Sequence, residues 1–315
     1  MPLYILRRLG FLLLTIVVTS ILIFSITQWL PGDVARILLG REAGEEALEE
    51  LREELGLNDP IPVQYVRWFS SFVIGNWGRS YSTDTEVFPL VMERLQNSLR
   101  LAGLTLVMSV PLAIVLGVLA GLNEDSLLDN AISVSSLAVV GLPEFVTGLI
   151  LIQIFAFTLD ILPASSSVAP GEGFFQTLPR LILPALTATL VLLAYVARLT
   201  RSGVIEEMEK SYVRTAELKG IPYRSVIFKH VLRNALLPTI TVIAISFGWL
   251  ISGLVVVENV FNYPGLGRLL VFAIDRRDLP LIQAVTMITV VGFASANLVA
   301  DLLYAVLNPR IRLGE

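Results

Sequence analysis

The chain has 315 residues, 55% of them hydrophobic, a formal net charge of −4 and a mean hydropathy of +0.75. Soluble domains are roughly 45–50% apolar, and the excess here lies in long runs with few charges, so the composition indicates a membrane protein. The chain has no cysteine and a single histidine, His230, which excludes disulfides, thiolate chemistry and Cys-based metal sites and disfavours a His-cluster metal site.

Six segments are apolar over the roughly 20 residues that a bilayer requires, which predicts an all-α polytopic membrane protein with six transmembrane helices. The third span is long and contains Gly141-Leu142-Pro143, so we expect a kink there. The first follows Arg7-Arg8, but no small-residue cleavage pattern comes after it, and we expect it to be retained as a span. The six predicted spans lie near Leu9–Leu30, Leu99–Leu122, Ala131–Leu159, Leu181–Leu199, Leu236–Val257 and Leu281–Leu307.

Residues 31–96 separate the first two spans and form a predicted outer segment. Within it, Glu42–Leu55 has helical periodicity, with leucines on one face and seven glutamates along the stretch, and Asn58-Asp59-Pro60 then breaks the chain. The pattern favours a small amphipathic unit resting on the membrane interface, where Trp and Tyr concentrate. A docking surface for an extracytoplasmic partner is a compatible alternative. The aromatic residues that follow the break are Tyr65, Trp68, Phe69, Phe72 and Trp77.

The distribution of Lys and Arg in the short loops predicts the orientation of the chain. With a cytoplasmic N-terminus, twelve basic residues lie inside and four outside, which favours both termini in the cytoplasm and residues 31–96 outside. The inner set is Arg7, Arg8, Arg198, Arg201, Lys210, Arg214, Lys219, Arg224, Lys229, Arg233, Arg310 and Arg312, and the outer set is Arg180, Arg268, Arg276 and Arg277.

Sequence patterns of the common catalytic sites are missing from the chain. It contains no Gly-x-x-x-x-Gly-Lys-Ser/Thr loop for ATP phosphates, no Gly-x-Ser-x-Gly and no His-Glu-x-x-His. We therefore expect that the chain is not an enzyme and binds no cofactor or metal. If ATP drives its activity, another subunit must supply the hydrolysis.

One long cytoplasmic loop, about residues 202–237, is predicted to hold two short helices around a break. Ser211–Lys219 is followed by Gly220, a natural helix stop, and by Ile221-Pro222; Arg224–Asn234 then forms a basic amphipathic piece. An ordinary positive-inside loop would also explain the basic residues. A short helix held between two spans could instead act as a rigid lever on which a soluble partner pulls.

Several membrane-depth residues are candidates for function or packing. Glu144 and Asp301 are ionisable groups within predicted spans and are functional candidates by default. For Glu144 a carboxylate at a polar helix interface is an equal alternative, and for Asp301 a structural pair with an interfacial Arg is favoured. Gly117 and Gly121 form a Gly-x-x-x-Gly helix-packing pattern. Pro264-Gly265 and Gly267 indicate either a partly re-entrant outer gate or a simple tight loop.

The loop sequence Tyr212–Gly220, continuing through His230–Pro238, resembles the cytoplasmic coupling loop of ABC importer permeases, most closely the first permease of the dipeptide/oligopeptide/nickel family. Ala216 and Gly220 match the general importer signature, whereas Arg214 and Thr215 replace its first two residues. Further stretches resemble this family in order along the chain: Leu6-Arg7-Arg8, Leu30-Pro31-Gly32-Asp33, Gly75–Ser80, Glu258–Gly267, Arg277–Pro280 and Asn308–Arg312.

The resemblance implies a type I ABC importer permease that forms half of a translocation pathway for dipeptides or oligopeptides in the cell membrane. It also implies a second homologous permease, two ATPase subunits that bind ATP and Mg, and an extracytoplasmic substrate-binding protein. The coupling residues would be Tyr212, Arg214, Thr215, Ala216, Glu217, Lys219 and Gly220, and the pathway or gate candidates are Glu144, Glu258, Pro264, Gly265 and Gly267.

Three units follow from this interpretation: residues 1–30 with the first span, the outer segment 31–96, and a five-helix core 97–315 that carries the coupling loop. Nickel chelates and oligosaccharides remain alternative substrates, since similar permeases serve them. An ion-coupled secondary transporter is a rival of a different class, but it usually needs several intramembrane charges and repeated halves. An intramembrane enzyme is disfavoured because paired catalytic residues are missing from the sequence.

Overall fold

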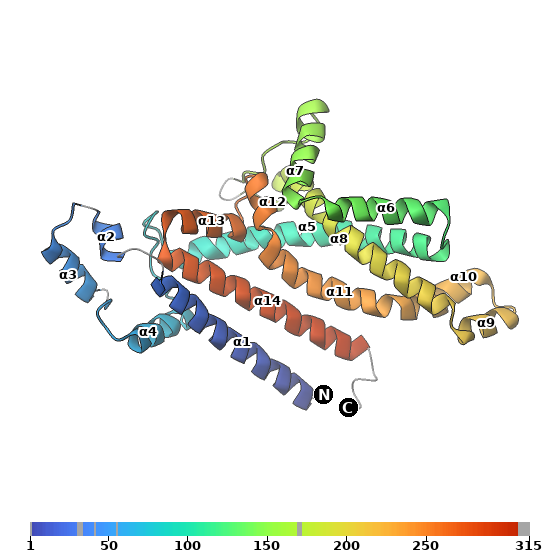
Figure 1. Cartoon of the computed structure of the whole chain (residues 1–315), viewed down its shortest axis with the longest axis horizontal. Helices are drawn as coiled ribbons and strands as arrows, with labels where there is room; N and C mark the ends of the chain where they lie inside the picture. The colour runs from blue at the N-terminus through green and yellow to red at the C-terminus, as the bar shows by residue number, and fades with distance from the viewer. Residues whose placement is uncertain (1, 30–33, 41, 55, 169–171, 308–315) are drawn as a thin grey trace.

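The computed structural model describes residues 2–29, 34–40, 42–54, 56–168 and 172–307. Within these residues the regular structure is helical, apart from one isolated bridge between Arg79 and Glu86 (Figure 1). The stretches Leu30–Asp33 and Asn308–Arg312, which carry part of the family resemblance, lie outside the described residues, and so do Arg310 and Arg312 of the charge count.

Five described helices are long and apolar enough to cross a membrane, and a bent pair makes a sixth if its two helices count as one span. The bent pair consists of α6 (Leu127–Gly141) and α7 (Glu144–Ile152), which continues into the π-helical η1 (Gln153–Thr158). These helices confirm the prediction of an all-α, polytopic fold. The five spanning helices are α1 (Pro2–Trp29), α5 (Val87–Leu122), α8 (Phe174–Met208), α11 (Leu232–Gly253) and α14 (Leu279–Leu307).

Several predicted boundaries were wrong because helices extend past their apolar runs. Helix α5 begins at Val87 instead of Leu99, and its 36 residues make it about 54 Å long, well beyond the roughly 30 Å hydrocarbon layer. The predicted separate piece Arg224–Asn234 is also wrong. It consists of α10 (Tyr223–Val226), η2 (Ile227–Val231) and the first turn of α11, which together form one continuous spanning helix.

The kink predicted in the third span is a bend of 103° between α6 and α7. Pro143 is the N-cap of α7 with an extended backbone, ψ 137°, and it has no N–H to continue the hydrogen-bond ladder of α6. Helix α7 therefore projects steeply away from α6 (Figure 1). It packs against α8 and against α12 (Val255–Val260).

Glycines allow the closest helix contact in the core, between α5 and α8. A Cβ added to Gly117 would lie 2.5 Å from the carbonyl oxygen of Ala197, and one added to Gly121 would lie 2.9 Å from that of Arg201. Real Cβ atoms do not approach backbone oxygens so closely, so these two positions have room only for glycine. The predicted packing role of the Gly-x-x-x-Gly pattern is confirmed.

The outer segment contains three helices, α2 (Val34–Leu39), α3 (Glu45–Glu54) and α4 (Ile61–Val73). Helix α3 agrees with the predicted amphipathic helix, and its Leu48 is fully buried. Helix α4 was not predicted as a helix. It attaches the segment to the first span, because Tyr65 contacts Phe24 ring to edge at 5.6 Å and its hydroxyl is 2.8 Å from Ser20 Oγ.

The start of α1 and the end of α14 lie side by side at the lower centre of Figure 1, the loop after α8 lies at the right, and α2–α4 lie at the left. At the end near the termini, Arg8 of α1 pairs with Asp301 of α14 at 2.7 Å. This ion pair confirms the favoured interpretation of Asp301 as a structural partner of an interfacial arginine.

Candidate functional site

The predicted coupling helix is α9 (Ser211–Leu218), which begins after α8 and ends at a left-handed glycine. Gly220 has φ +74°, its N–H donates to Glu217 O at 2.9 Å, and the Ile221 N–H donates to Ala216 O at 3.3 Å. These two bonds form a Schellman motif, in which glycine is the residue best suited to the left-handed position. Ile221 also packs into the same apolar cluster as Ala216, as such motifs commonly do.

A buried carboxylate anchors α9 to both neighbouring spans. Glu207, at the end of α8, accepts hydrogen bonds from the Tyr212 hydroxyl at 2.6 Å, from Lys210 Nζ at 3.0 Å and from Asn234 Nδ2 of α11 at 3.2 Å. The hydrogen bond to Glu207 raises the pKa of Lys210, and burial together with the same carboxylate raises the pKa of Tyr212, so both remain donors. Since one residue bonds α8, α9 and α11, these three elements can move together.

The two faces of α9 differ in character. Val213 and Ala216 face inward and pack against residues of α8 and α10. The outward face carries the predicted residues Arg214, Thr215, Glu217 and Lys219, all exposed. Sequence reasoning missed Leu218, which is 82% exposed at the end of this helix, and Phe228, which is 72% exposed in η2. The inner face thus belongs to the fold, and the outer face remains available to a partner.

At the opposite end of the molecule, α12 and α13 (Leu266–Arg276) form a packed outer hairpin around Glu258, which is 1% exposed. Its Oε1 accepts from Ser98 Oγ of α5 at 2.6 Å, and its Oε2 accepts from the backbone N–H of Arg268 at 3.0 Å. The carboxylate therefore occupies the N-terminus of α13, where backbone N–H groups lack partners and negative charge is favourable.

The other predicted gate residues, Pro264, Gly265 and Gly267, lie in or beside the turn of this hairpin. An added Cβ at Gly265 would lie 2.1 Å from Glu258 Oε1, and one at Gly267 would lie 2.5 Å from Val255 Cα. Pro264 O accepts from Asn97 Nδ2 of α5 at 2.9 Å. Pro264 and Gly265 also line a cavity of about 260 Å³, so this turn borders open space on one side.

A second buried acid, which the sequence analysis did not select, joins the outer segment to the last span. Asp278 is fully buried, and its Oδ2 accepts from Ser80 Oγ at 2.6 Å and from both the N–H and the hydroxyl of Ser82 at 2.9 and 2.7 Å. The residue before it, Arg277, is left-handed with φ +54°. Two stretches of the family resemblance, Gly75–Ser80 and Arg277–Pro280, thus meet in space, although 198 positions separate Ser80 from Asp278.

The predicted pathway residue Glu144 lies at the first position of α7, beside the 103° bend. Its Oε1 is buried without a hydrogen-bond partner in the structure, and so is Oγ1 of Thr147 one turn further on. Buried polar atoms normally have a partner, so the start of α7 carries two unsatisfied polar groups beside the bend.

Helices α6 and α8 are joined by a bidentate ion pair that the sequence analysis also missed. Arg201 Nε and Nη2 donate to the two carboxylate oxygens of Asp129 at 2.5 and 2.6 Å, and the Asp129 side chain is 2% exposed. Ser126 caps α6 by accepting from the Asp129 N–H. The pair fixes the position of α6 below the bend.

A bundle of helices long and apolar enough to span a membrane, with a short exposed helix anchored to two of them, fits a membrane transport component. Family comparisons identify it further. Residues 113–313 match the binding-protein-dependent transport system inner membrane component, and residues 1–102 match the N-terminal region of such membrane components. The chain belongs to this family of multi-pass inner membrane permeases.

Curated relatives match over almost the whole chain. It is 39% identical over 312 residues to the "Probable peptide ABC transporter permease protein y4tP" of Sinorhizobium fredii, covering 99% of this chain and 100% of the relative. It is 36% identical over 309 residues to the glutathione transport system permease protein GsiC of Escherichia coli, covering 98% of each. A solved amino acid ABC transporter is 15% identical, covers 70% of this chain and 94% of its own, and superposes with a TM-score of 0.49.

Membership of this family confirms that the chain is a non-catalytic permease subunit of an ABC importer. ATP is bound and hydrolysed by separate subunits, and the permease holds no cofactor of its own. By family, such a subunit works with an ATPase, a second permease and a binding protein.

Proposed function

We propose that this permease forms one half of a translocation pathway for dipeptides or oligopeptides, and that it couples the pathway to ATP hydrolysis through α9. The outward face of α9, Arg214 to Lys219, would bind a groove of the ATPase. Glu207 supports this assignment most directly, because it ties α9 to α8 and α11 and would transmit a displacement of the helix to both spans.

The peptide assignment rests on the names of the relatives, which are a probable peptide permease and a glutathione permease. Glutathione is itself a small peptide, so the two relatives agree in substrate class. The permease would pair with a homologous second permease, sit above two ATPase subunits and receive its substrate from an extracytoplasmic binding protein. Nickel chelates and oligosaccharides remain the alternatives.

The experiment for this function is uptake into proteoliposomes that contain the permease with its copurified subunits and binding protein. ATP-dependent accumulation of a labelled dipeptide or tripeptide supports the proposal. If only a nickel chelate or only an oligosaccharide accumulates, the substrate belongs to that class and is not a peptide. Uptake that follows an ion gradient without ATP would contradict the coupling mechanism as a whole.

The projecting helix α7 supports the proposed pairing with a second permease. It extends away from α6 after the bend, and its exposed apolar side chains include Phe145 and Leu149, which are 49% and 54% exposed. Glu144 begins this helix with a buried oxygen that has no hydrogen-bond partner in the structure. We infer that α7 borders the pathway at the interface with the second permease.

Replacing Glu144 by glutamine should lower the rate of substrate uptake or change substrate preference, and should leave assembly intact. The substitution keeps the size of the side chain but removes its charge from the pathway surface. Initial uptake rates of two peptides of different charge provide the measurement. Glu124→Gln, which changes an exposed acid in the loop before α6, is the matched control. If the Glu144→Gln variant takes up both peptides at the rates of the unaltered permease, Glu144 serves packing and not the pathway.

We further propose that both termini and α9 are cytoplasmic and that α2–α4 are extracytoplasmic, following the twelve-to-four distribution of basic residues. A cysteine introduced at Glu46, on exposed α3, should react with a membrane-impermeant maleimide in intact cells. The chain has no native cysteine, so the background is low. A cysteine at exposed Lys219 is the control and should react only after the membrane is opened. The reverse pattern would invert the topology.

A further inference from the structure

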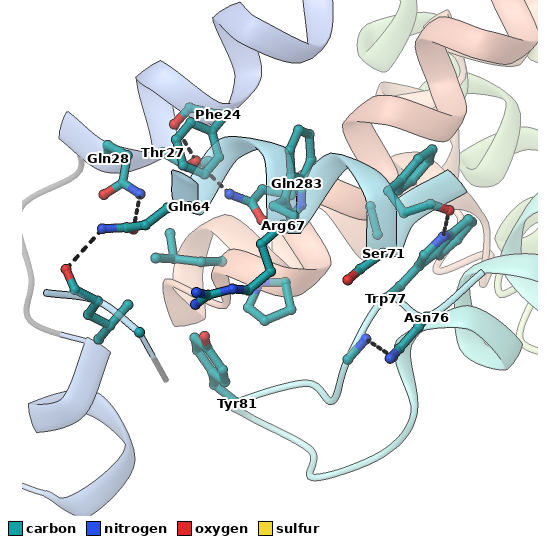
Figure 2. A pocket seen from close by; sticks show the side chains of 18 residues that line it. Phe24, Thr27, Gln28, Gln64, Arg67, Ser71, Asn76, Trp77, Tyr81 and Gln283 are labelled. Carbon is teal, nitrogen blue, oxygen red and sulfur yellow. Dashed lines mark hydrogen bonds between the residues drawn. The ribbon is translucent and has the colours of Figure 1, made fainter. Parts of the chain in front are cut away.

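A cavity of about 480 Å³ opens between the outer end of α1, helix α4 and the start of α14 (Figure 2). Gln28 of α1, Gln64 of α4 and Gln283 of α14 contribute polar groups to its wall. Figure 2 shows the Arg67 side chain reaching across the middle of this space, with Tyr81 facing it from the loop below. The cavity belongs to neither the coupling helix nor the outer hairpin.

The charge of the cavity selects the kind of ligand. Among the described residues that line it, Arg67 is the one that carries a charge, and its partner Asp59 is not among them. Arg67 Nη2 pairs with Asp59 at 2.5 Å, which leaves Nε and Nη1 without a carboxylate partner among the described residues. Burial and the nearby Asp278 raise the pKa of Tyr81 to about 12, so its phenol stays a neutral donor at physiological pH. Arg67 thus keeps part of its guanidinium free of Asp59, and the neutral Tyr81 hydroxyl also lines the cavity, which favours a singly charged anion such as a phosphodiester.

The position of the cavity relative to the membrane indicates that the phosphodiester belongs to a lipid. The spanning part of α1 ends at Trp29, and α14 begins at Leu279, so the cavity lies where two spans leave the hydrocarbon layer. Trp68 and Trp77 line it, and such aromatic side chains concentrate at the level of lipid headgroups. Exposed apolar residues continue on both sides, with Ile26 of α1 58% exposed and Val66 of α4 63% exposed.

We propose that this cavity is a binding site for the headgroup of an anionic phospholipid, with the phosphodiester on Arg67 and the acyl chains along the exposed face of α1. A headgroup that carries an ammonium would find only the Asp59 carboxylate, which Arg67 already engages, whereas the hydroxyls of a glycerol headgroup can donate to the amide oxygen of Gln28 or bond to the Tyr81 hydroxyl. The site therefore selects a hydroxylated, anionic headgroup. The bound lipid would fill the gap between α1, α4 and α14.

The test is native mass spectrometry of the permease complex, purified in mild detergent and titrated with a short-chain phosphatidylglycerol. Arg67→Gln should weaken binding about tenfold or more, since it removes the charge-assisted bonds to the phosphate. Asp59→Asn is the matched control. It breaks the same ion pair but keeps the guanidinium, so binding should stay equal or become tighter, while both variants lose the same intramolecular contact.

Parallel titrations separate the possible ligands. Phosphatidylethanolamine should bind more weakly than phosphatidylglycerol, and inorganic phosphate should not compete at equal concentration. Unchanged lipid binding by Arg67→Gln, equal loss in Asp59→Asn, or full competition by inorganic phosphate would each overturn the proposal. If Arg67→Gln binds lipid unchanged but the binding protein stimulates its ATPase activity less, the lipid proposal fails and the cavity is a docking site for that protein. The lipid titrations do not depend on transport, so their result is independent of the proposed substrate.

Discussion

Replacing Gly220 by valine should uncouple ATP hydrolysis from uptake or weaken ATPase binding, while the permease still inserts into the membrane. Gly220 has φ +74°, and a residue with a Cβ in the left-handed region costs roughly 1–2 kcal/mol. No atom lies within 4 Å of the position of an added Cβ, so the penalty comes from the backbone and not from a clash. The strain should disrupt the Schellman bonds to Glu217 O and Ala216 O and displace the end of α9.

A free-energy change of this size alters the population of the correct α9 conformation by a factor of roughly 5–30. The measurements are the amount of permease in the membrane, substrate-stimulated ATPase activity and peptide uptake in the assembled complex. Gly220→Asn is the matched control, because asparagine tolerates the left-handed conformation, and it should retain most of the uptake. A second variant, Glu217→Lys, changes only the exposed face of α9 and tests the contact with the ATPase without backbone strain. Normal uptake and normal stimulation in Gly220→Val and Glu217→Lys together would exclude α9 as the coupling element.

Replacing Arg201 by methionine should lower the thermal stability of the assembled permease more than any exposed substitution. The change leaves the Asp129 carboxylate, 2% exposed, without its bidentate partner. Breaking a buried ion pair from one side costs roughly 3–5 kcal/mol, and we expect the lower end because the Arg201 side chain is 27% exposed. The loss should appear as a lower unfolding temperature of the detergent-purified complex, with α6 detached from α8.

The double variant Asp129→Leu/Arg201→Met separates a charge effect from a packing effect. Replacing both partners removes the uncompensated charge, so much of the lost stability should return. Arg198→Met, an exposed arginine one turn earlier on α8, is the control and should change the unfolding temperature little. If the double variant is as unstable as Arg201→Met, the pair stabilises the fold through packing and not through its charge.

The sequence predicted the existence of the spans and the stop of the loop helix at Gly220, although not their boundaries, because the physical causes are local. Apolar runs of about 20 residues identify membrane helices without reference to any neighbour, and Gly220 before Ile221-Pro222 is a local helix stop that the structure confirms. The kink at Pro143 was predictable for the same reason. Its angle was not, because the 103° bend depends on how α7 packs against α8 and α12.

The buried polar contacts were not predictable, because each joins distant parts of the chain. Asp278 stood in the sequence only as part of the family-like stretch Arg277–Pro280, and its partner Ser80 lies 198 positions away. Glu207 and Asp129 resemble ordinary cytoplasmic acids until Tyr212 and Arg201 are seen beside them. Residue type gave no signal of these pairs, and only the arrangement of helices shows which acids are buried. Most of the buried polar residues described above join parts of the chain that are distant in sequence.

The contact between the first and last spans has a consequence for biogenesis. Helix α1 packs mainly against α14, through Arg8–Asp301 at one end and Thr27–Gln283 at the other. The ribosome delivers α1 first and α14 last, so α1 must wait in the bilayer with its polar face uncovered while the intervening spans are inserted. Ser80 of the outer segment also lacks its partner during this time, because Asp278 is synthesised only just before α14. A nascent chain that stalls before residue 278 therefore leaves Thr27 without Gln283 and Ser80 without Asp278, and those missing contacts distinguish an unfinished permease from a complete one for any membrane protease that surveys the bilayer.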